Sequence, residues 1–331
     1  MNTSHEYSDI KFGISNNGER YFWAAYHFFV LLSSLIGDTL ILIASFQKDA
    51  FKVSKILVTI IQHIAVSDLV FAISTVLPAT ISLLANSWVL GGTICYVQVY
   101  LISYYVYLSG MSLIAILTTS KFLILRYPLR AATWSTNRVH LICSLVWTIS
   151  VINPILFFTV DKHDVFFDYR NYYCEYGFTD KIWRKILIPI TGCIFGLVPN
   201  VIIVATTIPT LKYLVDATKV AKRVQGTVPW QGALTVAATA VVYCISTLPH
   251  IIYKICWGLG FIKEGNPGGW SHIQYYRVSS FLLLVDIMSN FYIYTLTIKS
   301  FRKFLLTKVL CFVPASLSSV RDMCLSSTGN I

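Results

Sequence analysis

Three carboxylates lie inside apolar segments of this 331-residue chain. Asp68 ends a long run of mostly Ile, Val, Leu, Thr and Ala, Asp38 lies in SLIGDTLILIAS, and Asp286 lies in FLLLVDIMSN. An ionised carboxylate at mid-membrane depth costs several kcal/mol, so such residues usually mark an ion site, a proton relay or a switch. We therefore expect the interior of this protein to be its functional centre rather than a mere anchor.

A polar stripe extends from one of these acids. Asp286, Asn290 and Tyr294 are spaced by four residues, so they share one face of a helix. This face should point into a bundle, because lipid offers these groups no hydrogen-bond partner.

The elements that position these residues follow from the composition. Hydrophobic residues make up 56% of the chain and charged residues 12%. A helix of about 20 apolar residues spans a bilayer, and the sequence contains such stretches at about 21–47, 56–85, 93–120, 139–160, 182–211, 229–262 and 273–297. We predict an all-α membrane protein, a seven-transmembrane helix bundle with a short amphipathic eighth helix.

The predicted parts of the chain are an outer N-terminus at 1–20, the bundle at 21–297, the amphipathic helix at 298–312 and a disordered, Ser-rich inner tail at 313–331. This orientation places most Lys and Arg residues inside, as the positive-inside rule requires. The net charge of +11 then reflects topology and anionic lipid, and nucleic acid is not needed as a partner. The sequon at Asn2 would lie outside and could carry a glycan.

Two cysteines differ from the others by their predicted position. Cys95 and Cys174 both fall on the outer, oxidising side, and their pairing would tie the top of helix 3 to the second outer loop. Cys311 follows a basic, amphipathic stretch after helix 7. It could be palmitoylated, or it could be a free thiol at the lipid interface.

Several local motifs occur in a fixed order along the seven spans. They are Gly37-Asp38 in helix 1, Ala65 to Leu69 in helix 2, Trp88 to Cys95 in the first outer loop, Arg126-Tyr127-Pro128-Leu129 after helix 3, Trp147, Pro199, Pro249, and Asn290 to Tyr294 in helix 7. In this order they resemble the rhodopsin-like family of G-protein-coupled receptors across residues 21–311. The resemblance implies a plasma-membrane receptor with an extracellular N-terminus, an extracellular ligand and a heterotrimeric G-protein partner.

The resemblance also implies a polar switch around Asp68. In related receptors the helix 7 stripe meets the helix 2 acid around a sodium ion and water, and Asp38 would lie beside Asp68. Three like charges cannot all ionise in a low-dielectric interior. Either a cation such as sodium at Asp68 neutralises them, or some stay protonated in a hydrogen-bonded cluster. Ser109 and Ser112 are the only neighbours of Gly110 that could replace a serine ligand of the family.

The chain departs from the family at positions that move during activation. Ser120-Lys121-Phe122 replaces Asp-Arg-Tyr at the inner end of helix 3, and Asp38 replaces an Asn. Further departures are Thr207, Thr247 and Phe291. Lys121 would contact the G protein in place of the family's Arg, without an adjacent acid to restrain it. Alternatively, Lys121 could extend to lipid headgroups.

The ligand end lacks the residues of two known receptor chemistries. Ser103 and Ile102, the candidates for the amine-binding acid of helix 3, are not acidic, and Leu284 replaces the lysine that binds retinal. We therefore expect no retinal or other cofactor and disfavour a classical biogenic amine. The candidate pocket residues are Ser103, Tyr104, Tyr107, His250, Tyr253, Lys254, Trp257, Gln274, Tyr275 and Arg277. Lys254 could meet an anionic ligand group or extend to the outer interface.

Three function classes remain open. A G-protein-coupled receptor fits the motifs best. The altered switch residues favour a heptahelical orphan scaffold or heteromer partner without G-protein output. A transporter or channel would also use buried acids, but it predicts inverted repeats or broken helices that we do not find. An enzyme is not expected, because the sequence has no metal-ligand spacing, nucleophile elbow or phosphate loop.

Overall fold

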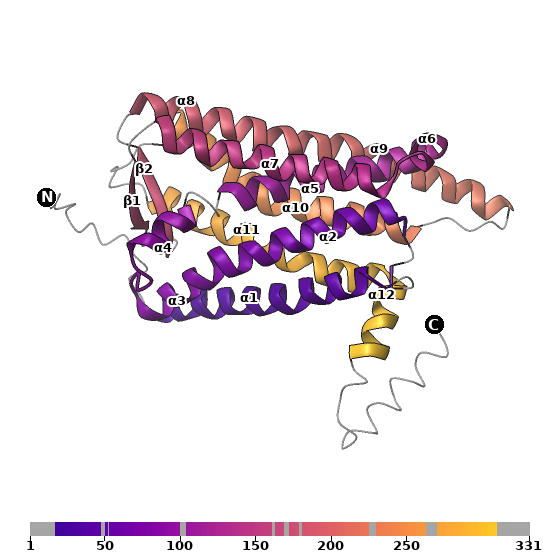
Figure 1. The fold of residues 1–331 in the computed structure, drawn as a ribbon, viewed down its shortest axis with the longest axis horizontal. Coiled ribbons are helices and arrows are strands. Elements are labelled where there is room, and N and C mark those ends of the chain that lie inside the picture. Colours follow the sequence, from indigo (N-terminus) through magenta and orange to yellow (C-terminus); the bar gives the residue numbers. More distant parts are fainter. Residues whose placement is uncertain are drawn as a thin grey trace, which may run out of the picture.

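The structure is a computed structural model that describes residues 17–47, 50–51, 53–99, 104–160, 163–168, 172–178, 181–224, 230–262 and 270–309. Long helices lie side by side along the longest axis of the molecule (Figure 1). The helical elements are α1 (Asn17–Ser45), α2 (Lys55–Phe71), η1 (Ala72–Val76), α3 (Leu77–Ala85), α4 (Gly92–Val97), α5 (Tyr104–Arg126), α6 (Pro128–Ala132), α7 (Thr136–Val160), α8 (Lys181–Thr191), η3 (Gly192–Leu197), α9 (Val198–Val224), α10 (Trp230–Gly258), α11 (Trp270–Thr297), α12 (Lys299–Phe304) and η4 (Leu305–Val309).

These elements confirm the predicted bundle. Six described segments are long and apolar enough to cross a membrane, namely Asn17–Ser45, Lys55–Ala85, Leu108–Arg126, Lys185–Lys219, Gly232–Gly258 and Tyr275–Thr297. A shorter apolar stretch in α7, Thr136–Ile152, corresponds to the remaining predicted span. The bounds of the spans differ from the prediction by a few residues in most cases. The largest extensions at a C-terminal end are those of α5, which continues to Arg126, and α9, which continues to Val224.

Local sequence explains several helix ends. The Ser54 Oγ accepts a hydrogen bond from the backbone N–H of Leu57 over 3.4 Å, which caps the start of α2. Asn86 ends α3 in the left-handed conformation, with φ 56°, which asparagine tolerates better than most residues. The π-helical turns η1 and η3 each continue a span without a break.

A two-stranded hairpin between α7 and α8 was not predicted. Strands β1 (His163–Asp168) and β2 (Tyr173–Phe178) pair antiparallel, with Phe167 opposite Cys174. Their Val, Phe and Tyr residues favour strands. The predicted helix bundle is confirmed, and the hairpin is an additional element at one end of it.

The two ends of the bundle differ in character. The hairpin and α4 lie at one end, which we call the disulfide end, and α6 and α12 lie at the other, which we call the basic end (Figure 1). Arg126 and Arg130 are exposed at the basic end. After α11, α12 and η4 form the predicted eighth helix. This helix buries Phe301 and Phe304 and exposes Lys303.

Packing divides between interior and surface as expected for a membrane protein. One buried apolar cluster joins α1, α2, α5, α9, α10 and α11 and includes Ile41, Ile60 and Tyr243. Large apolar side chains are also exposed on the outer surface, among them Ile36 at 57% and Ile245 at 63%. Such exposure costs little against lipid tails, which are as apolar as the side chains themselves.

Candidate functional site

The predicted polar stripe of α11 meets the acid of α2. The Nδ2 of Asn290 donates a hydrogen bond to the Oδ2 of Asp68 over 2.8 Å, and both residues are buried. An intramolecular hydrogen bond contributes about 0.5–1.5 kcal/mol, and more where one partner is charged. This contact therefore holds the middle of α11 against the middle of α2.

Asp38 joins the same interior from α1. The Oγ of Ser34, one helical turn earlier, donates a hydrogen bond to the Oδ2 of Asp38 over 2.5 Å. Asp38 interacts electrostatically with Asp68 and Asp286, and Tyr294 interacts with all three acids. We call these residues and Asn290 the polar cluster.

The polar cluster contains buried oxygen atoms that could hold a cation. Within the described part of the chain, the Oδ1 atoms of Asp38, Asp286 and Asn290 and the hydroxyl of Tyr294 have no hydrogen-bond partner. Leaving a buried polar group unpaired costs about 1–3 kcal/mol. Oxygen ligands suit hard cations, so these groups fit the implied sodium ion.

The geometry limits which groups such an ion could contact. Among the described residues, no group of three or more His, Cys, Asp or Glu side chains is placed to hold one metal ion. The predicted sodium site at Asp68 therefore stays a prediction, with the unpaired oxygens of Asp286 and Asn290 as its candidate further ligands. Of the proposed serine substitutes, Ser112 donates its hydroxyl to the Leu108 carbonyl over 3.1 Å.

Ser67, a residue that the sequence analysis did not single out, lies next to Gly110. A Cβ at Gly110 would lie 3.5 Å from the Oγ of Ser67, the neighbour of Asp68 on α2. No spacing rule pointed to Ser67, because its approach depends on how α2 packs against α5.

At the basic end, Lys121 is buried against α10. Lys121 is only 6% exposed. Its Nζ lies 3.1 Å from the position that a Cβ would take on Gly232 of α10. This burial argues against the interpretation that Lys121 extends to lipid headgroups. The ion pairs seen among the described residues join Lys219 to Asp216 and Arg277 to Glu19, and neither of them includes Lys121.

The same end has a second link between helices. The hydroxyls of Thr235 on α10 and Thr297 on α11 are 2.7 Å apart and share a hydrogen bond. Together with the Lys121 contact, this bond holds the basic end of α10 between α5 and α11.

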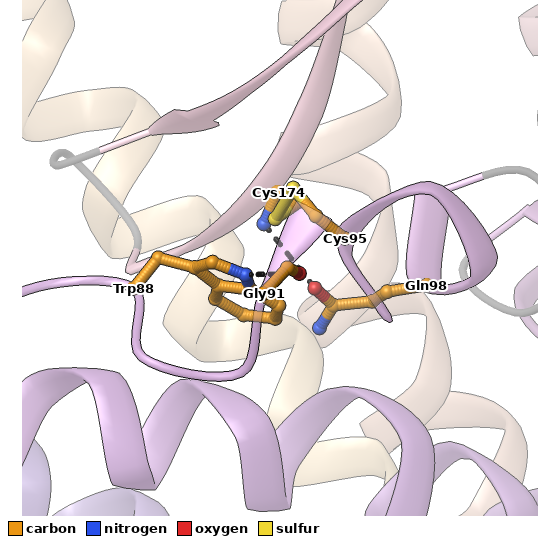
Figure 2. Close-up of a disulfide and its surroundings, with 5 residues drawn as sticks. All are labelled: Trp88, Gly91, Cys95, Gln98 and Cys174. Carbon is orange, nitrogen blue, oxygen red and sulfur yellow. Dashed lines mark hydrogen bonds between the residues drawn. A yellow bond between two sulfur atoms is a disulfide. The ribbon is translucent and has the colours of Figure 1, made fainter. Parts of the chain in front are cut away.

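The disulfide end is closed by the predicted cysteine pair. Cys95 of α4 and Cys174 of β2 form a disulfide, with Cα atoms 5.5 Å apart (Figure 2). The Oε1 of Gln98 accepts a hydrogen bond from the Cys174 backbone N–H over 3.3 Å, and the Nε1 of Trp88 donates to the Gly91 carbonyl over 2.8 Å. The hairpin is thereby fastened over this end of the bundle.

A cationic and aromatic group lies between α10 and α11 near this end. The Nζ of Lys254 donates a hydrogen bond to the Tyr276 hydroxyl over 3.0 Å and lies 4.8 Å from the centre of that ring. It also lies 5.6 Å from the ring centre of Trp257. Tyr253 and His250 stack on Tyr276, with ring centres 4.7 Å and 5.7 Å away.

Tyr276 is the second residue that the sequence analysis missed. It is 14 positions before Asn290, close to four full turns of a helix, so it lies on the polar face of α11. Counting back along that face would have found it. The predicted Tyr275 is instead 45% exposed and donates its hydroxyl to the Pro249 carbonyl over 3.2 Å.

Arg277, a predicted pocket residue, links two helices at this end. Its guanidinium pairs with Glu19 of α1 over 2.8 Å, and Glu19 also accepts a hydrogen bond from Trp23 Nε1. This pair holds the first turns of α1 and α11 together.

The family described as seven-transmembrane receptor (rhodopsin family) matches residues 37–294. This chain belongs to that family. It is a multi-pass membrane protein, and the matching family is one of receptors rather than enzymes.

Individual receptors of this family show moderate identity. Galanin receptor 2a of Danio rerio is 27% identical over 258 residues, which cover 73% of this chain and 66% of that protein. Proteinase-activated receptor 1 of Xenopus laevis is 32% identical over 107 residues, covering 31% and 25%. C-X-C chemokine receptor type 2 of Oryctolagus cuniculus is 25% identical over 193 residues, covering 57% and 51%. The matches thus span between a quarter and 66% of these relatives.

One departure of this receptor from its family has a clear packing role. Phe291 stands where the family has a proline, and a Cβ at Gly37 would lie only 2.6 Å from the Phe291 Cβ. The absence of a side chain at Gly37 lets α1 approach α11 beside Asp38 and Asn290. Phe291 therefore helps to set the geometry of the polar cluster.

Some predicted positions of the receptor lie outside the described residues. These are Asn2, Ser103 and Cys311, and the side chains of Tyr104, Tyr107 and Gln274. Their predicted roles in glycosylation, ligand binding and palmitoylation stay predictions.

Proposed function

We propose that this receptor transduces an extracellular signal to heterotrimeric G proteins at the plasma membrane. In this proposal the disulfide end and the N-terminus face outward, and the basic end faces the cytoplasm. The charge distribution of the sequence supports the orientation, because Lys and Arg gather at the inner ends of spans.

The observation that carries the proposal is the placement of Lys121. Its amine is buried between α5 and α10 at the basic end, next to Gly232. A movement of α10 away from α5 would expose this cation to a partner. The C-terminal tail of a G protein ends in carbonyls and a carboxylate, so it needs a cationic donor of this kind.

The polar cluster would couple the two ends in this proposal. Asp68 and Asn290 join α2 to α11, and Thr297 at the end of α11 bonds to Thr235 of α10. A change in the Asp68–Asn290 contact would therefore reach α10 through α11. The proposal requires a second arrangement of these contacts, in which α10 lies farther from α5.

In this proposal the ligand would bind at the cationic and aromatic group between α10 and α11. Lys254 and the Tyr276 hydroxyl present hydrogen-bond donors among the rings of Tyr253 and Trp257. This chemistry suits a ligand with an anionic or strongly accepting group beside an apolar part. It offers no reason to expect a biogenic amine.

The proposal is tested by measuring activation of each Gα class in cells that express the receptor, with and without a ligand library. We expect at least one Gα class to respond, and Lys254→Met to weaken the response to anionic ligands more than Lys185→Met does. Lys185 is an exposed control on α8. The absence of activation in every Gα class, with a bound agonist present, would favour a scaffold or heteromer partner instead.

A further inference from the structure

Two histidines outside the polar cluster face each other across a helix interface. His63 on α2 and His140 on α7 bring Nε2 and Nδ1 to 3.1 Å, with ring centres 5.3 Å apart. His63 is half-buried and His140 is exposed. The proposed signalling mechanism uses neither residue.

The two nitrogens now point almost directly at each other, as in an N–H···N hydrogen bond. A small rotation of both rings would let them become neighbouring ligands of one metal ion, because their separation falls in the range of such ligands. Zinc–imidazole bonds are about 2.0–2.1 Å long. Two such ligands are therefore about 3.4 Å apart at a tetrahedral angle and about 2.9 Å apart at a right angle. The observed 3.1 Å lies between these values.

We propose that His63 and His140 form a binding site for a divalent transition metal, with zinc as the fitting ion. Imidazole nitrogen is a preferred ligand of zinc, copper and nickel, whereas magnesium prefers oxygen. The proposal does not depend on G-protein signalling.

Binding requires no loss of protons from the pair. One ring now donates an N–H to the other, and for metal binding the donor moves its proton to its far ring nitrogen. Both rings then remain neutral, and each directs one lone pair at the metal, as neutral imidazole ligands do.

Water can complete the coordination at this position. His140 lies in the second turn of α7, two residues after the exposed Arg138, at the basic end of the bundle. Within the described chain, no third His, Cys, Asp or Glu side chain joins the pair to form a larger metal-binding group. The site therefore has two protein ligands and open positions for water.

A metal at this site would fasten α2 to α7. Asp68 lies on α2 five residues after His63, so the fastened helix carries the acid of the polar cluster. A ligand that binds the folded state alone stabilises that state by mass action. Metal binding should therefore raise the thermal stability of the receptor.

The test uses the purified full-length receptor and follows thermal unfolding during titration with zinc chloride or magnesium chloride. The variants are His63→Gln and His140→Gln, with His272→Gln on α11 as the matched control. We expect a saturable zinc response in the wild type and the control, at least tenfold weaker apparent zinc affinity in both test variants, and no matching response to magnesium.

An equal zinc response in the wild type and both test variants would overturn the proposal. So would an equal response to magnesium, or no response to micromolar zinc. If a variant does not fold, Cu²⁺ bound to the wild type is examined by electron paramagnetic resonance. Coupling to two imidazole nitrogens supports the site, and coupling to fewer overturns it.

Discussion

Asn290 donates a hydrogen bond from its Nδ2 to the Oδ2 of Asp68 over 2.8 Å, and this bond joins α11 to α2 inside the bundle. Asp38 is tied instead to Ser34 of its own helix. Of the two acids, Asp68 is therefore the one whose hydrogen bond would change directly if α2 and α11 moved apart.

The first prediction concerns the charge of Asp68. Asp68→Asn keeps the side-chain volume but removes the carboxylate that would attract a cation, so we expect signalling to lose its dependence on sodium or pH. Asp38→Asn and Asp286→Asn should change that dependence less. Nucleotide exchange on Gα is measured in sodium chloride and in choline chloride at several pH values.

One result for all three Asn variants would refute the proposal that the polar cluster is an ion or proton switch. If all three Asn variants keep the wild-type response to sodium and pH, the polar cluster is only a structural hydrogen-bond network.

The second prediction concerns the contact between Gly37 and Phe291. A Cβ at Gly37 would lie 2.6 Å from the Phe291 Cβ and 2.8 Å from its Cγ. Overpacking of this kind costs about 1–3 kcal/mol. Gly37→Ala should therefore lower the thermal stability of the receptor, and Phe291→Gly in the same chain, which removes the Cβ as well as the ring, should restore part of it.

The matched control for this cycle is Gly92→Ala, because a Cβ at Gly92 meets nothing within 4 Å. It should leave stability nearly unchanged. Additive effects of Gly37→Ala and Phe291→Gly would show that the two residues do not interact.

The third prediction concerns Gly232. A Cβ there would lie 3.1 Å from Lys121 Nζ, at the far end of a flexible side chain. Gly232→Ala should thus displace the amine from α10 at little cost in stability and raise basal nucleotide exchange. Unchanged basal exchange together with unchanged stability would show that this contact does not restrain the receptor.

The fourth prediction concerns the disulfide. Cys95→Ser or Cys174→Ser should destabilise the receptor by about 2–4 kcal/mol, because the bond closes a chain segment with a sequence separation of 79. The double variant should cost no more than either single one. Detection of both cysteines as free thiols, by mass spectrometry of a non-reduced digest of the wild type, would disprove the bond.

The bundle could be predicted from sequence because apolar length and charge asymmetry are properties of each segment alone. The meeting of Asp68 and Asn290 was also foreseen, since ordered motifs along the chain resemble those of a known family. The hairpin at 163–178 was missed, because its short strands depend on a disulfide and a loop rather than on a long periodic pattern.

The contacts of individual side chains could not be predicted in the same way. Gly37 against Phe291 and Gly232 beside Lys121 depend on how closely two helices approach, and sequence spacing does not give that distance. The partner of Arg277, Glu19, lies 258 residues away in sequence. Such pairings appear only when the helices are packed.

The central claim is that this receptor activates G proteins through Lys121, and it is tested most directly with purified receptor and purified Gα. Nucleotide exchange is measured at matched levels of wild type, Lys121→Ala and Lys121→Arg. A charge-assisted hydrogen bond contributes about 1.5–3 kcal/mol, so we expect the Ala variant to lose about ten- to a hundredfold in exchange rate. The Arg variant should keep or exceed the wild-type rate. Full exchange by Lys121→Ala, or no exchange by agonist-bound wild type with any Gα class, would contradict the account.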